Sequence, residues 1–75
     1  MSERDEILAI LAYWVRYYRK QQELSQLELA VRSGVDTRQI GRIEQRKNLP
    51  SLVLAIRLAK VLKVTLNDLV QPKPT

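Results

Sequence analysis

Basic side chains gather between residues 37 and 47 of the 75-residue chain. Arg38 and Arg42 stand four positions apart, so on a helix they share one face. A guanidinium group donates hydrogen bonds in a fixed fork, which suits planar acceptor pairs such as O6 and N7 of guanine. Thr37 precedes them and offers a methyl and a hydroxyl group. These residues could bind an anionic polymer that displays base edges, provided that a helix turns them to solvent.

The composition excludes several other kinds of chemistry. The chain has neither Cys nor His, so it lacks the usual ligands of zinc, haem and iron–sulfur groups and the Ser–His and Cys–His pairs of nucleophilic catalysis. We therefore expect no catalytic residues, no metal, no cofactor and no small-molecule ligand. No apolar run approaches the roughly 20 residues of a membrane span. A cytoplasmic location without membrane attachment is expected.

Positive charge is in excess over the whole chain. Lys and Arg number 13 against 8 Asp and Glu, which gives a net charge of +5. A small basic domain is typical of proteins that bind nucleic acid or another anionic surface. A surface that merely keeps the protein in solution has the same composition, so charge alone leaves both interpretations open.

Helical periodicity and capping residues run through most of the sequence. They predict an all-α fold class, a compact five-helix domain over residues 1–70 with an extended first helix from about residue 3, followed by a flexible tail over residues 71–75. The predicted helices cover residues 3–22, 26–33, 37–46, 52–62 and 66–70. The expected N-caps are Ser2, Ser25, Asp36, Ser51 and Thr65, with Asp5, Glu28, Gln39 and Asp68 as candidate capping-box partners.

The second and third helices have the pattern of a helix-turn-helix. Ala30 is small enough for two helices to cross closely, and Gly34 suits a left-handed turn between them. Ile40 and Ile43 must face inward, which defines the opposite face of the third helix. The residues on that outward face are Thr37, Arg38, Gly41, Arg42 and Gln45.

These spacings resemble the Cro/lambda-repressor-like (XRE-type) helix-turn-helix family. The resemblance covers roughly residues 11–70 and implies a lambda-repressor-like domain whose second and third helices form the DNA-binding unit. It further implies a sequence-specific transcriptional regulator, usually a repressor, that binds a palindromic operator in double-stranded DNA as a homodimer. Small stand-alone members such as restriction–modification controller proteins are similar. The matching motifs are Leu24-Ser25-Gln26, Glu28-Leu29-Ala30, Gly34-Val35, Ile40, Ile43-Glu44, Pro50-Ser51-Leu52 and Leu58-Ala59-Lys60.

The resemblance also assigns roles to single residues, with the helix over residues 37–46 in the major groove. The implied base contacts are Thr37, Arg38, Gln39 and Arg42. The implied phosphate contacts are Ser25, Gln26, Gln45, Arg46, Lys47 and Asn48. Arg19 and Glu44 are implied as a partly buried ion pair that ties the first helix to the third.

Two residues of this region leave alternatives open. Arg46 stands where the family commonly has Gly, so either Arg46 accepts a strained left-handed conformation or the helix ends differently. Gly41 lies inside a helix, where it costs up to about 1 kcal/mol relative to Ala. It either gives clearance for close approach to DNA or is merely tolerated.

The sequence has more apolar residues at positions expected to face solvent than a small monomer needs. We expect a homodimer interface made by Val53, Leu54, Leu66 and Leu69. The extended first helix either joins that interface or folds over its own core. A second class of function also stays open, an antitoxin or other protein-interaction module in which partner binding is the main role. The paired arginines favour DNA.

Overall fold

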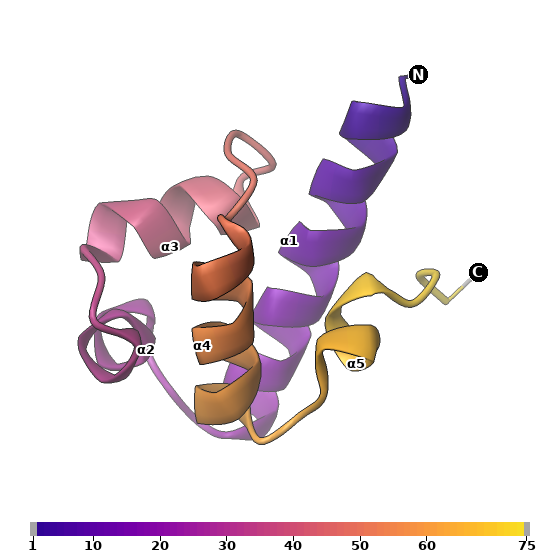
Figure 1. Ribbon diagram of the computed structural model, residues 1–75. Coiled ribbons are helices and arrows are strands. Elements are labelled where there is room, and N and C mark those ends of the chain that lie inside the picture. Colours follow the sequence, from indigo (N-terminus) through magenta and orange to yellow (C-terminus); the bar gives the residue numbers. More distant parts are fainter. Residues whose placement is uncertain (1, 75) are drawn as a thin grey trace.

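The computed structural model describes residues 2–74 and contains, within them, five α-helices and no strand. The helices α2 and α3 lie on one side of α4, and α5 lies on the other (Figure 1). The expected all-α, five-helix class is confirmed. Met1 and Thr75, which belong to the expected domain and tail, lie outside the described residues. The helix bounds are α1 Glu3–Gln21, α2 Gln26–Ser33, α3 Thr37–Glu44, α4 Leu52–Leu62 and α5 Leu66–Val70.

Each helix begins where a side chain satisfies a backbone N–H that has no partner inside the helix. Capping boxes join Ser2 to Asp5, Ser25 to Glu28 and Thr65 to Asp68. The helix α3 differs, because Oδ1 of Asp36 accepts the backbone N–H of Arg38 at 2.8 Å. Within the described chain the expected box with Gln39 is not formed, which corrects that prediction.

A single apolar core draws on all five helices of residues 2–74. Ile40 and Ile43 expose 0% and 1% of their surface, so the opposite face of α3 is turned away from the core. Ala30 is equally buried and lets α2 and α3 pack closely. None of the helices described is both long enough and apolar enough to cross a membrane. The largest fully buried side chains are Val15, Leu29, Ile40, Ile43, Leu58, Leu62 and Leu69.

Two residues expected at a dimer interface belong to this core instead. Leu54 and Leu69 are 4% and 0% exposed, so neither can present a surface to a second copy. Leu54 stands four residues before Leu58 on the inward stripe of α4, and Leu69 anchors α5 in the core. Val53 is 61% exposed and Leu66 is partly exposed.

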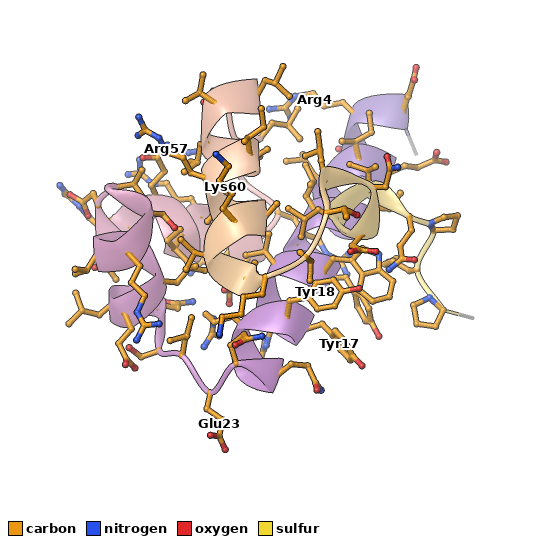
Figure 2. The ribbon with its side chains drawn as sticks, turned by 60° about the horizontal axis from the view of Figure 1, so that its bottom comes forward. Arg4, Tyr17, Tyr18, Glu23, Arg57 and Lys60 are labelled. Atoms are coloured by element: carbon orange, nitrogen blue, oxygen red, sulfur yellow. The ribbon has the colours of Figure 1, made fainter. Side chains whose placement is uncertain are left out.

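Polar side chains occupy other exposed parts of the surface. Arg57 and Lys60 project from the solvent side of α4, and Glu23 points away from the connection between α1 and α2 (Figure 2). Glu23 adopts a left-handed φ of 56° there. The exposed side of α4 is thus partly basic and partly apolar.

The chain after α5 is fastened to α1. The indole N–H of Trp14 donates to the backbone oxygen of Gln71 at 2.8 Å, and the side-chain amide of Gln71 donates to the Tyr18 hydroxyl at 3.1 Å. Figure 2 shows Tyr18 beside this segment. Gln71, the first residue of the tail expected to be flexible, thus makes two hydrogen bonds to α1.

The helix α3 ends at Glu44, two residues earlier than expected, in a turn without glycine. Arg46 adopts a φ of 63°. Its N–H donates to the oxygen of Ile43 at 3.1 Å, and the N–H of Lys47 donates to the oxygen of Arg42 at 2.9 Å. This is the bond pattern of a Schellman cap. Of the two alternatives, Arg46 accepts the left-handed conformation, which costs an L-residue about 1–2 kcal/mol.

Arg46→Gly should therefore be more stable than Arg46→Ala by about 1 kcal/mol, since glycine adopts this φ without a clash of its Cβ atom. Both variants remove the same charge, so the comparison isolates the backbone. Urea unfolding of the two proteins measures the difference. Equal free energies of unfolding would contradict a strained residue at this turn.

Candidate nucleic-acid interface

The outward face of α3 and the first residue of α2 form a shallow open groove. It is lined by Gln26, Thr37, Arg38, Gly41, Arg42 and Gln45. Apart from Gln26, these are the residues that the inward packing of Ile40 and Ile43 predicts for the outward face. An adjoining hollow is lined by Asp36, Arg38, Gln39, Arg42 and Asn48.

The structure brings the residues expected to contact bases to one side of the molecule. Arg38 and Arg42 line both hollows, while Thr37 lines the first and Gln39 the second. Arg46, Lys47 and Asn48 follow α3 and are exposed, but only Asn48 lines the second hollow. Arg46 instead lines a separate hollow formed by α1 and the segment after α5. Ser25 differs from the other expected phosphate contacts, because its hydroxyl oxygen already accepts the backbone N–H of Glu28 at 3.0 Å. Its main role here is to cap α2.

A bidentate ion pair lies behind this face. Nε of Arg19 donates to Oε2 of Glu44 at 2.7 Å and Nη2 donates to Oε1 at 3.0 Å. The side chains of Arg19 and Glu44 are only 12% and 4% exposed. Arg19 also donates to the backbone oxygen of Leu24 at 2.8 Å. The hydrogen bond to Glu44 holds the pKa of Arg19 above its ordinary value, against the effect of burial.

The same carboxylate also holds the start of α2. Nε2 of Gln26 donates to Oε1 of Glu44 at 3.2 Å. A carboxylate accepts and does not donate, so the amide nitrogen of Gln26 faces Glu44. The amide oxygen lies 3.8 Å from where a Cβ atom on Gly41 would stand. Glu44 therefore connects α1, α2 and α3, and the expectation from sequence included the link to Arg19 alone.

Asp36 and Arg38 form a second contact that was not predicted. Nη2 of Arg38 lies 3.2 Å from Oδ2 of Asp36, and Nε makes a longer contact of 3.5 Å with Oδ1. The hydrogen bond from the Arg38 side chain holds the pKa of Asp36 below its ordinary range, and the pair raises the pKa of Arg38. Opposite charges two residues apart across an N-cap were the available signal in the sequence.

Packing within the protein does not require glycine at position 41. A Cβ atom there would meet Gln26 Oε1 at 3.8 Å, which is an ordinary van der Waals distance. The free chain thus has room for alanine in the middle of α3. The groove that Gly41 lines is where its missing side chain leaves space.

The chemistry of this face is that of an anion-binding surface with directed donors. Arg38 and Arg42 supply its positive charge, and Asp36 is the acidic residue among the lining positions. Across residues 2–74, no cluster of three or more carboxylates, imidazoles or thiols is placed to hold a metal ion. The face suits contact with phosphates and base edges.

Together, the close crossing of α2 and α3 and the outward arginines define a helix-turn-helix DNA-binding protein. The chain belongs to the XRE-type helix-turn-helix family, which matches residues 15–69. It is therefore a DNA-binding transcriptional regulator and not an enzyme.

Comparisons with individual proteins agree with this family assignment. The chain is 40% identical over 55 residues to an uncharacterized HTH-type transcriptional regulator of Methanocaldococcus jannaschii, across 73% of this chain and 83% of that protein. Its structure is similar to a hypothetical transcription factor from Neisseria, with a TM-score of 0.86 and 28% identity over 96% of this chain and 83% of the other. It is also similar to the restriction-modification controller protein C.AhdI from Aeromonas hydrophila, with a TM-score of 0.79 and 32% identity over 83% and 94%.

Glu44→Gln should lower the free energy of unfolding by about 2 kcal/mol, because it leaves the largely buried Arg19 guanidinium without a counter-charge. Chemical denaturation measures the loss. A double variant, Arg19→Met with Glu44→Leu, should recover part of it, since no charge is then left unpaired. Unchanged stability of Glu44→Gln would show that the pair does not hold α3 in place.

Proposed function

We propose that the chain is a sequence-specific repressor that binds a palindromic operator as a homodimer, with α3 in the major groove. The observation that carries this proposal is the groove along the outward face of α3, where two arginines and a threonine lie together while Ile40 and Ile43 are buried. An α-helix fits the major groove of B-DNA and carries its outward side chains to the base edges. Such a role places the protein in the cytoplasm with its DNA.

Direct reading of bases falls to the first turns of α3. Arg38 and Arg42 each have the donors for bidentate bonds to O6 and N7 of guanine. Thr37 offers its methyl group to thymine or its hydroxyl to a neighbouring base, and Gln39 lies next to them in the adjoining hollow. These four residues set the preferred sequence.

Contacts to phosphates are assigned to the residues that follow α3 and to those at the start of α2. Gln45, Arg46, Lys47 and Asn48 follow α3 and supply two positive charges and two amides. Ser25 and Gln26 mark the N-terminus of α2, where the helix dipole and the first backbone N–H groups favour a phosphate. Such contacts fix the register of the protein on the duplex and make affinity depend on salt.

An apolar patch on α4 supports the homodimer. Leu52, Val53 and Ile56 are 66%, 61% and 41% exposed although each is a large apolar residue. Exposed apolar patches mark association surfaces. Of the interface expected from the sequence, exposed Val53 and partly exposed Leu66 are kept in the proposed interface, and the buried Leu54 and Leu69 are dropped. Twofold pairing would set two recognition helices about 34 Å apart, one turn of DNA.

Selection of bound sites from random duplexes tests the proposal as a whole. A palindromic consensus with half-sites about one helical turn apart is expected. Selection of a single asymmetric half-site would overturn the homodimer, and failure to enrich any sequence would overturn sequence-specific binding. To test repression, the selected site is placed over a promoter, and the protein should then lower transcription from it.

Arg42→Ala should weaken binding to the selected duplex by about 1–3 kcal/mol and broaden the preference at one base pair. Lys47→Ala removes the same charge from a proposed phosphate contact. It should weaken cognate and random duplexes alike and lower the salt slope by about one unit. Titrations at two salt concentrations separate these patterns. Equal loss on both duplexes for Arg42→Ala would reassign that residue to the phosphates.

Val53→Glu should convert the dimer to a monomer and weaken binding to the palindrome, because it places a charge in an apolar interface. Val31→Glu is the matched control, since Val31 is similarly exposed, at 70%, but belongs to α2 and not to the patch. Sedimentation at micromolar concentration and operator titration measure both effects. A dimer that persists in Val53→Glu would place the interface elsewhere.

A further inference from the structure

The guanidinium group of Arg38 is already held before any DNA arrives. Its Nε and Nη2 atoms face the two carboxylate oxygens of Asp36 at 3.5 and 3.2 Å. The carboxylate is itself held, because Oδ1 accepts the backbone N–H of Arg38 at 2.8 Å. An anchored acid at the start of α3 thus sets the direction of the arginine side chain.

Surrounding packing does not set that direction. The side chain of Arg38 is 79% exposed and that of Asp36 is 56% exposed. Arg38 lines both the groove and the adjoining hollow, so an unrestrained side chain could turn into either of them or towards a phosphate. An exposed ion pair of this kind adds little to stability. Its effect is on orientation.

The Asp36 carboxylate contacts only one edge of the Arg38 guanidinium group and leaves the edge suited to guanine free. Asp36 takes the edge formed by Nε and Nη2. The opposite edge, formed by Nη1 and the second N–H of Nη2, keeps two parallel donors. Two parallel donors are what the O6 and N7 atoms of guanine accept.

We propose that Asp36 is a specificity-determining positioning residue, which holds Arg38 with its outer edge towards the bases and keeps it from binding phosphate. The carboxylate occupies the edge that would otherwise take a phosphate oxygen, and its charge repels the DNA backbone. Asp36 therefore lowers affinity for all DNA and raises the ratio of cognate to random binding. The inference rests on the proposed function, in which Arg38 reads a base.

Asp36→Asn tests this role separately from helix capping, since asparagine is an equally good N-cap. The duplexes are the consensus selected by the wild-type chain and a shuffled duplex of the same composition. Asp36→Asn should bind the shuffled duplex more tightly and lower the ratio of cognate to shuffled affinity by about tenfold, as expected for one lost bidentate base contact. Repeating the selection should show a broader preference at one base pair.

Arg38→Ala and the double variant complete the cycle. Arg38→Ala should lose preference at the same base pair, and Asp36→Asn should then change the affinity ratio no further. If Asp36→Asn leaves the ratio and the preference unchanged while Arg38→Ala alters them, Asp36 is a cap alone and the inference is overturned. If Asp36→Asn lowers the ratio equally without Arg38, the inference also fails. If Arg38→Ala leaves the preference intact, the proposed base contact fails together with it.

Discussion

The position of the DNA-facing helix depends on one buried carboxylate, that of Glu44. Apolar packing of Ile40 and Ile43 has no strong direction, so by itself it would allow α3 to slide or rotate. The bonds from Arg19 and Gln26 have defined lengths and angles. A carboxylate removed from water without such partners is costly, which makes the native arrangement of α1, α2 and α3 strongly preferred over a shifted one.

Because Glu44 fixes the orientation of α3, the two faces of this helix have different roles. The inner face adds apolar side chains to the core, while the outer face keeps polar groups free of the fold. The left-handed turn at Arg46 then directs the chain away from the helix and leaves charged residues beside it. Arg46 thus keeps a strained backbone conformation that glycine would adopt without strain, and the residue that bears this cost carries a positive charge.

Local signals in the sequence determine much of this structure. The bounds of α2, α4 and α5 agree with those expected, because caps and stop signals act within a few residues. The dimer residues could not be assigned in this way. Whether Leu54 or Val53 faces the core depends on how α4 rotates against the other helices, and the anchoring of Gln71 depends on α1, 57 residues away along the chain. The Asp36–Arg38 pair has only a weak signal in the sequence, since opposite charges two residues apart do not by themselves show that the side chains meet.

The bond between Trp14 and Gln71 has a consequence for observing this protein. Trp14 is the chain's single tryptophan, and its indole nitrogen is tied to the segment that leaves α5. Its ring also lies 5.5 Å from that of Tyr18, which Gln71 contacts as well. The indole therefore lies where the core meets the segment after α5, and its intrinsic fluorescence responds to loss of that contact and of the core, with no attached dye.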